Sequence, residues 1–270
     1  MRKILFIAIS FLFGTNCLSQ KEDSIMIKKI SDDILINGKA YDNLRHLTKK
    51  IGGRLAGSPQ MTIAEQWGEQ VMRSSGADRV IMQECKVPHW VRGGEDKAEV
   101  TGGKKLDVVA LGNSMGSGAR GVKAEVLLVN SYDELEKKRD EVKDKIVFYN
   151  YKFNPTYIQT FRSYGDASQY RGSGPSRAAK YGAKAVIVRS MSHSTDNNPH
   201  TGATRYIDSF AKIPAVAIGL RDADWLSEEL QKGKLSVQIK TKLRMEKHST
   251  STEQMPYANA IRCSTPKMRS

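Results

Sequence analysis

Histidine and carboxylate side chains are the groups in this chain that could bind a metal ion or move a proton. The five histidines are His46, His89, His193, His200 and His248. The densest cluster, formed by His193, Asp196 and His200, lies in one irregular stretch and lacks the helix- or strand-borne spacing of protein metal sites. Glu228 and Glu229 lie on a predicted helix and are typical of a solvated helix face. The sequence therefore predicts no catalytic residue and no metal ligand.

Two glycine-rich stretches imitate catalytic motifs. Gly112-Asn-Ser-Met-Gly116 has the spelling of a nucleophile elbow, but its second position and its context do not fit the strand-to-helix turn of that motif. Residues 51–58 (Ile-Gly-Gly-Arg-Leu-Ala-Gly-Ser) could be mistaken for a phosphate loop, yet they lack the Gly-Lys-Ser/Thr ending and follow no strand. We therefore predict neither a serine nucleophile nor a nucleotide site.

Periodicity predicts helices first and an α/β alternation afterwards. Residues 24–76 have helical spacing, with Ser58 as the N-cap and Pro59 as the first residue of the third helix. Strands are predicted near residues 80–87, 106–111, 124–129, 145–149, 185–188 and 214–218, with an edge strand over 235–245. Helices are predicted to begin at the Ser131 capping box, over 176–181 and over 221–232. The long polar stretches 151–174 and 190–212 are predicted to be loops, where binding surfaces tend to lie.

The N-terminal residues and the net charge limit the class of protein to which this chain can belong. Arg2 and Lys3 precede an apolar run over residues 4–14 that is too short to span a membrane and is typical of a signal peptide cleaved near Ser19. The formal net charge of +14 becomes 14 − 2 = +12 without those two residues. The basic runs are short and mixed with acids, so nucleic-acid binding is not expected. The sequence predicts a secreted or periplasmic protein without a membrane span.

Several of these stretches resemble carboxypeptidase Q, also called plasma glutamate carboxypeptidase, and its bacterial relatives among the zinc peptidases. The matching stretches are residues 51–58, 87–93, 145–148, 180–183, 199–202 with 205–206, and 213–218. The resemblance implies an α/β fold. It also implies a signal peptide at 1–19, the leading helices and first strands of the peptidase domain at 20–115, an inserted protease-associated domain at 116–246, and a linker with an aberrant tail at 247–270.

The resemblance also implies zinc chemistry in intact relatives, which cleave short peptides and could form homodimers. Their metal ligands follow a strand that would begin near Asn259, in Gly-x-His-x-Asp-Ser, Asp-Asp-Gly and Glu-Glu segments. None of these follows here, where residues 259–270 are polar and basic. We therefore expect a truncated, inactive member of a secreted zinc metallopeptidase family, with no cofactor of its own. The alternative is a secreted, non-catalytic module that binds peptides or proteins.

The residues that the resemblance places nearest a substrate are in the second long loop. They are His200, Thr201, Gly202, Arg205 and Tyr206. In this family the loop belongs to the inserted domain, which can overhang the catalytic cleft, so these residues are candidates for controlling substrate access. Stabilisation of the loop is the alternative role. Cys85 and Cys263 could pair in an oxidising compartment, or remain a strand cysteine and an incidental thiol.

Overall fold

The computed structural model describes the backbone of residues 21–259 and side chains as far as Glu246. The expected signal peptide, the tail 260–270 and Cys263 lie outside this range. The chain divides into two units, one ending at Arg54 and the other beginning at Leu55. No helix within the described range is long and apolar enough to cross a lipid bilayer.

The first unit is helical, as its periodicity predicts. A helix over residues 21–37 is followed by α2 (Ala40–His46), which continues directly into the π-helical turn η1 (Leu47–Ile51). The apolar stripe of the first helix is on the surface of this unit, since Ile27, Ile30 and Ile34 are 67%, 53% and 62% exposed.

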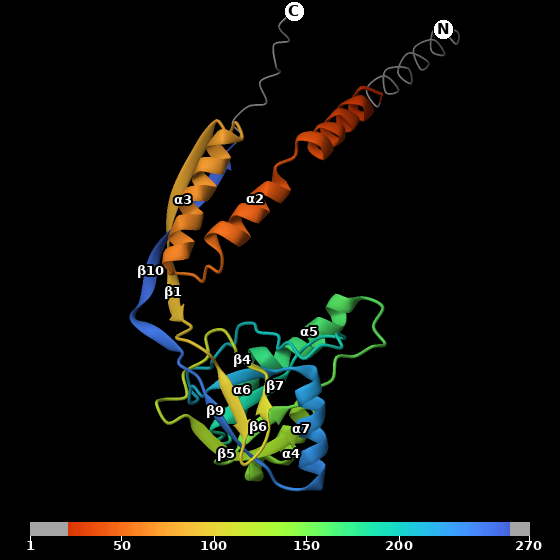
Figure 1. The fold of residues 1–270 in the computed structure, drawn as a ribbon, viewed down its shortest axis with the longest axis vertical. Helices are drawn as coiled ribbons and strands as arrows, with labels where there is room; N and C mark the ends of the chain where they lie inside the picture. Colours follow the sequence, from red (N-terminus) through yellow and green to blue (C-terminus); the bar gives the residue numbers. More distant parts are fainter. Residues whose placement is uncertain (1–20, 260–270) are drawn as a thin grey trace, which may run out of the picture. The chain divides into compact units, whose positions relative to one another are not determined.

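A two-stranded antiparallel sheet with one helix begins the second unit. Helix α3 (Pro59–Ser74) starts where the sequence predicts, because the Ser58 side chain accepts a hydrogen bond from the Met61 N–H at 3.2 Å. Strand β1 (Arg79–Val91) pairs with β10 (Arg244–Asn259), and α3 packs against them (Figure 1). The helical spacing of Ile63, Trp67 and Val71 predicts an inner face for α3, but Ile63 is 53% exposed. Cys85 is half-buried in β1.

The second sheet has eight strands and forms the larger part of this unit (Figure 1). Its order is β3-β2-β9-β5-β6-β7-β8-β4. The strands are β2 (Lys97–Val100), β3 (Lys105–Leu106), β4 (Val108–Ala110), β5 (Val122–Val129), β6 (Ile146–Tyr149), β7 (Ala185–Arg189), β8 (Ala215–Ile218) and β9 (Ser236–Lys240). Strands β5 to β8 are parallel neighbours, and the others pair antiparallel.

Helices cover both faces of this sheet, as buried parallel strands require. Helix α7 (Leu220–Lys232) packs on one face through Ala223 and Leu226. The other face is covered by α4 (Tyr132–Lys137), the 3-10 turn η2 (Arg139–Glu141), α5 (Thr160–Gly172) and α6 (Gly174–Ala179). The central strands β6, β7 and β8 are buried at every position. The α/β fold class predicted from the sequence is confirmed.

Three predicted elements differ from the structure. The strand predicted over 106–111 is interrupted at Asp107 and forms β3 and β4, at opposite edges of the sheet. The stretch 151–174 contains α5, which the polar composition concealed because the helix buries only Ser163, Ala167 and Tyr170. The strand predicted at the edge, β9, lies between β2 and β5, with Val237 and Ile239 fully buried. Apolar and polar residues alternate along β9 because one face of the strand is buried and the other is in contact with solvent, and not because the strand is at an edge of the sheet. The sequence analysis places a domain boundary between residues 115 and 116. Strands β2, β3 and β4 lie before this boundary but pair in the same sheet as β5 to β9. The domain boundary remains a prediction.

Candidate functional site

The first half of the predicted access loop lies against the end of β4. The Thr201 hydroxyl donates to the carbonyl oxygen of Ala110 at 2.9 Å. The Gly112 N–H donates to the carbonyl oxygen of Gly202 at 2.8 Å, and Gly112 forms a parallel bridge with Ala203. The His200 N–H donates to the Ser190 hydroxyl at 2.8 Å. The loop backbone therefore extends the edge of the sheet.

The second half of the loop is tied to α5, α6 and the β8 entrance. The Arg205 N–H donates to the carbonyl oxygen of Gly172 at 2.8 Å. The Tyr206 hydroxyl donates to the Ile213 carbonyl and accepts from the Met115 N–H at 3.2 Å. Burial raises the pKa of the Tyr206 phenol above its ordinary value, so it remains a hydrogen-bond donor at neutral and mildly alkaline pH.

These contacts bring the five predicted residues into one ordered segment, with their side chains in different settings. His200, Thr201 and Arg205 are exposed, whereas Tyr206 is half-buried. The backbone of the segment stabilises the fold, and only the exposed side chains are free to meet another molecule. Control of substrate access by these residues stays a prediction.

Replacing Tyr206 with phenylalanine is expected to destabilise the protein by about 1–3 kcal/mol, because the Ile213 carbonyl and the Met115 N–H lose their partner. His200→Ala, at an exposed side chain, is the matched control and should change stability by less than about 0.5 kcal/mol. Urea unfolding followed by circular dichroism measures both. Equal stability of Tyr206→Phe and the native chain would show that the phenol does not anchor the loop.

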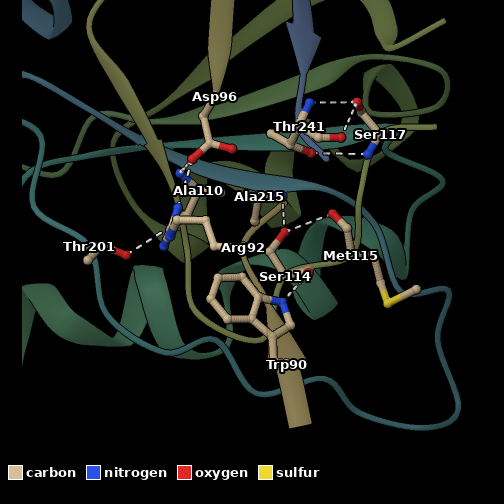
Figure 2. Close-up of polar contacts among 10 residues, drawn as sticks. All are labelled: Trp90, Arg92, Asp96, Ala110, Ser114, Met115, Ser117, Thr201, Ala215 and Thr241. Carbon is tan, nitrogen blue, oxygen red and sulfur yellow. Dashed lines mark hydrogen bonds and ion pairs between the residues drawn. The ribbon is translucent and has the colours of Figure 1, made fainter. Parts of the chain in front are cut away.

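A charged pair that the sequence analysis did not predict lies on the same outer edge of β4 as the loop (Figure 2). Arg92 Nη2 donates to the Ala110 carbonyl oxygen at 3.0 Å, and Asp96 Oδ2 accepts from the Ala110 N–H at 2.8 Å. Arg92 and Asp96 are themselves an ion pair at 2.7 Å. Together the two side chains occupy the place of a neighbouring strand. Opposite charges four residues apart, directly after a predicted strand, were the available sequence signal.

Trp90 fixes the point where β1 joins the larger sheet (Figure 2). Its ring is buried in the sheet core, and Nε1 donates to the Ser114 carbonyl oxygen at 2.9 Å. The Arg92 guanidinium lies over the same ring, 5.0 Å from its centroid. The Ser114 hydroxyl accepts from the Ala215 N–H at 2.8 Å and is only 1% exposed. Ser114 therefore ties Trp90 to the start of β8 through its carbonyl and hydroxyl oxygens.

A groove of about 630 Å³ opens beside this charged pair. Its walls come from residues 92–99, 105–109 and 197–199, and its charged side chains are of both signs. Asp96 and Asp107 are on its wall, and Asn197 Nδ2 donates to Asp107 Oδ2 at 2.6 Å. This groove lies next to the predicted loop, since residues 197–199 form part of its wall.

The weak metal candidate in the loop does not form a metal centre. The His193 ring packs edge-on against Phe153, with centroids 4.5 Å apart. Asp196 accepts hydrogen bonds from Ser194 and Asn198, and these lower the pKa of its carboxyl group. Within the described range, no group of three or more His, Cys, Asp or Glu side chains could hold a metal ion.

Comparison with known proteins gives the class. No family model matches the chain. A Peptidase M28 precursor from Shewanella amazonensis SB2B superposes with a TM-score of 0.81 at 28% identity, over 88% of this chain and 54% of that one. A zinc aminopeptidase from Bacillus subtilis superposes with a TM-score of 0.52 at 20% identity, over 79% and 45% of the two chains, and shares the fold alone. The fold is that of an M28-type peptidase.

The sequence relatives are more particular. Carboxypeptidase Q of Xenopus laevis is 34% identical over 243 residues, or 84% of this chain and 50% of the relative. Human carboxypeptidase Q is 34% identical over 221 residues, or 79% and 45%. The chain is therefore a homologue of carboxypeptidase Q, and the resemblance predicted from the sequence is confirmed. It spans about half the length of these relatives.

Proposed function

We propose that this chain supplies the leading part of a secreted zinc peptidase of the carboxypeptidase Q type. In this proposal, α3 with β1 and β10 belongs to the peptidase domain. The inserted protease-associated domain, proposed at residues 116–246, holds strands β5 to β9 of the eight-stranded sheet with their helices and restricts access to short peptides. The observation that carries the proposal is the 34% identity to carboxypeptidase Q over 84% of the chain. Export by a cleaved signal peptide and a possible homodimer remain part of the same proposal.

Zinc is the metal that this family implies. Whether this chain can bind it depends on which histidine, cysteine and carboxylate side chains lie close together. A site with two adjacent metals needs several histidine nitrogens and carboxylate oxygens converging on one point, with a nearby carboxylate to take a proton from water. The described residues bring no such group together. They do not fit zinc, so no catalytic step is assigned to them, and the proposed chain is inactive by itself.

Metal content and hydrolysis test this proposal together. The chain purified from zinc-supplemented medium is expected to hold well under one zinc per molecule by mass spectrometry, and to cleave no dipeptide with or without EDTA. Human carboxypeptidase Q, assayed in parallel, controls for the assay. Stoichiometric zinc with EDTA-sensitive hydrolysis would overturn the assignment of inactivity. His193→Ala combined with His200→Ala would then show whether the loop histidines bind the metal.

A non-catalytic secreted binding module is the second candidate. The observation that favours it is the groove beside Asp96 and Asp107, whose walls combine charged side chains, asparagine amides and the sheet edge at Val108. This function needs no metal. Saturable peptide binding that persists in EDTA, without turnover, would distinguish it from the peptidase proposal.

A further inference from the structure

Strand β4 is an edge of the eight-stranded sheet, and its register shows which backbone groups face outward. It pairs only with β8, in antiparallel register. The Leu111 N–H donates to the Ala215 carbonyl oxygen, and the Gly219 N–H donates to the Asp107 carbonyl oxygen. Because hydrogen-bonded and non-hydrogen-bonded pairs alternate, the N–H and C=O of Val108 and Ala110 face away from β8.

Two of the outward positions along this edge have partners. Ala110 is satisfied by Arg92, Asp96 and Thr201, as described above. Gly112 is satisfied by the loop, since its N–H donates to Gly202 and its carbonyl oxygen accepts from the Thr204 N–H, both at 2.8 Å. Val108 lies one step earlier on the same edge, and no described residue pairs with its outward N–H or C=O. Val108 also lines the groove.

The groove contains an unsatisfied acid beside this open position. The Asp96 side chain is only 4% exposed. Its Oδ2 accepts from Arg92 and Ala110, whereas its Oδ1 is buried and has no partner among the described residues. Figure 2 shows Oδ1 directed away from both of those partners. A buried carboxylate oxygen without a donor is costly, so a ligand donor that reaches Oδ1 is favoured, and this contact requires the Asp96 side chain to turn toward the groove.

The rest of the groove favours a positive ligand group. Lys97 is paired with Glu95 at 3.0 Å, and Arg92 is paired with Asp96. Among the remaining charged residues that line it, Glu99 and Asp107 outnumber Lys105. An ammonium group has three donors and no acceptor, which matches this surplus of carboxylate oxygens.

We propose that a short extended peptide with a free amino terminus binds in this groove as an added strand on β4. Its backbone exchanges hydrogen bonds with the N–H and C=O of Val108, and its terminal ammonium meets the carboxylates of Asp96 and Asp107. Strand addition to an open sheet edge is a general mode of peptide recognition, in which backbone bonds supply affinity and nearby side chains supply specificity. The site rests on the second candidate function, a binding module, and defines its ligand class, and it needs neither zinc nor hydrolysis.

Amide NMR of the whole 15N-labelled chain in EDTA tests the site, with trialanine as the ligand and N-acetyl-trialanine as the match that lacks the amino-terminal positive charge. Trialanine is expected to shift the Val108 amide resonance saturably, and the acetylated peptide to bind about tenfold more weakly, because it loses a charge-assisted hydrogen bond. Asp96→Asn should abolish this preference for the free amino terminus. Glu228→Gln, at an exposed acid on α7, should leave it unchanged.

Asp107→Asn keeps the test decisive if Asp96→Asn fails to fold, since Asp107 is exposed and lies on the same groove wall. It should reduce the preference for free trialanine while the Val108 shift persists. Absence of a saturable Val108 shift, or equal binding of the free and acetylated peptides, would overturn the proposal. Neither result depends on metal or turnover, so failure here is distinct from failure of the peptidase assignment.

Discussion

Replacing Trp90 with alanine is expected to lower the free energy of unfolding by about 3–5 kcal/mol, the usual cost of removing a buried tryptophan. The ring is 6% exposed and packs in the same core as the strands of the larger sheet. Its loss leaves a cavity, removes the N–H donor to the Ser114 carbonyl oxygen and takes away the surface on which Arg92 lies. Urea unfolding followed by far-UV circular dichroism measures the change without relying on the lost fluorophore.

Trp90→Phe separates these contributions. It keeps most of the apolar ring but leaves the Ser114 carbonyl oxygen without its donor, so a loss of about 1–3 kcal/mol is expected. The second readout is the Val108 amide shift with trialanine, which should weaken in Trp90→Ala because Arg92 no longer holds Asp96 in place. A Trp90→Ala protein as stable as the native chain would show that the ring is not part of the core.

The central strands could be predicted from the sequence because their chemistry is local. Short apolar runs such as residues 185–188 and 214–218 are buried on both faces and bounded by loops, which is the pattern of parallel strands. The N-caps at Ser58 and Ser131 were equally readable, and both side chains accept the expected backbone hydrogen bond. Helix α5 was missed because its contacts come from Tyr170 and two small side chains, which give almost no apolar stripe.

The candidate site was only half visible in the sequence. The loop residues His200 to Tyr206 were found through a family resemblance, but their attachment to Gly112 and Gly172 depends on strands and helices far away in the chain. The Arg92–Asp96 pair reaches Ala110 because the two edges of the sheet come together at this point. Strands β3 and β4 lie at opposite edges of the sheet, yet only Asp107 separates them in the sequence. Spacing along the chain cannot reveal which backbone edge a side chain will complete.

Asp222→Asn is expected to destabilise the protein by about 2–4 kcal/mol at neutral pH, because this carboxylate joins three parts of the sheet margin. The side chain is 3% exposed at the start of α7. Its Oδ2 accepts from the Asp107 N–H at 2.7 Å and from Asn197 Nδ2 at 2.9 Å. Its Oδ1 pairs with Lys104 Nζ at 2.6 Å, although Lys104 is 39% exposed, so solvent weakens that ion pair. An amide nitrogen in place of either oxygen would face a donor.

The effect should depend on pH in one direction. Burial by itself would raise the pKa of Asp222, but the hydrogen bonds from Lys104, Asp107 and Asn197 outweigh it and hold the pKa below the usual value. A group with a lowered folded pKa contributes stability above its unfolded pKa of about 3.9, and this contribution is lost as the pH falls through the folded pKa. The difference between the native chain and Asp222→Asn should therefore be full at pH 7 and shrink below about pH 4. Urea unfolding at pH 7, 5, 4 and 3 measures it, with Asp208→Asn, 94% exposed, as the control. A difference in stability that stays constant across this pH range would mean that the charge on Asp222 does not contribute to the stability of the fold.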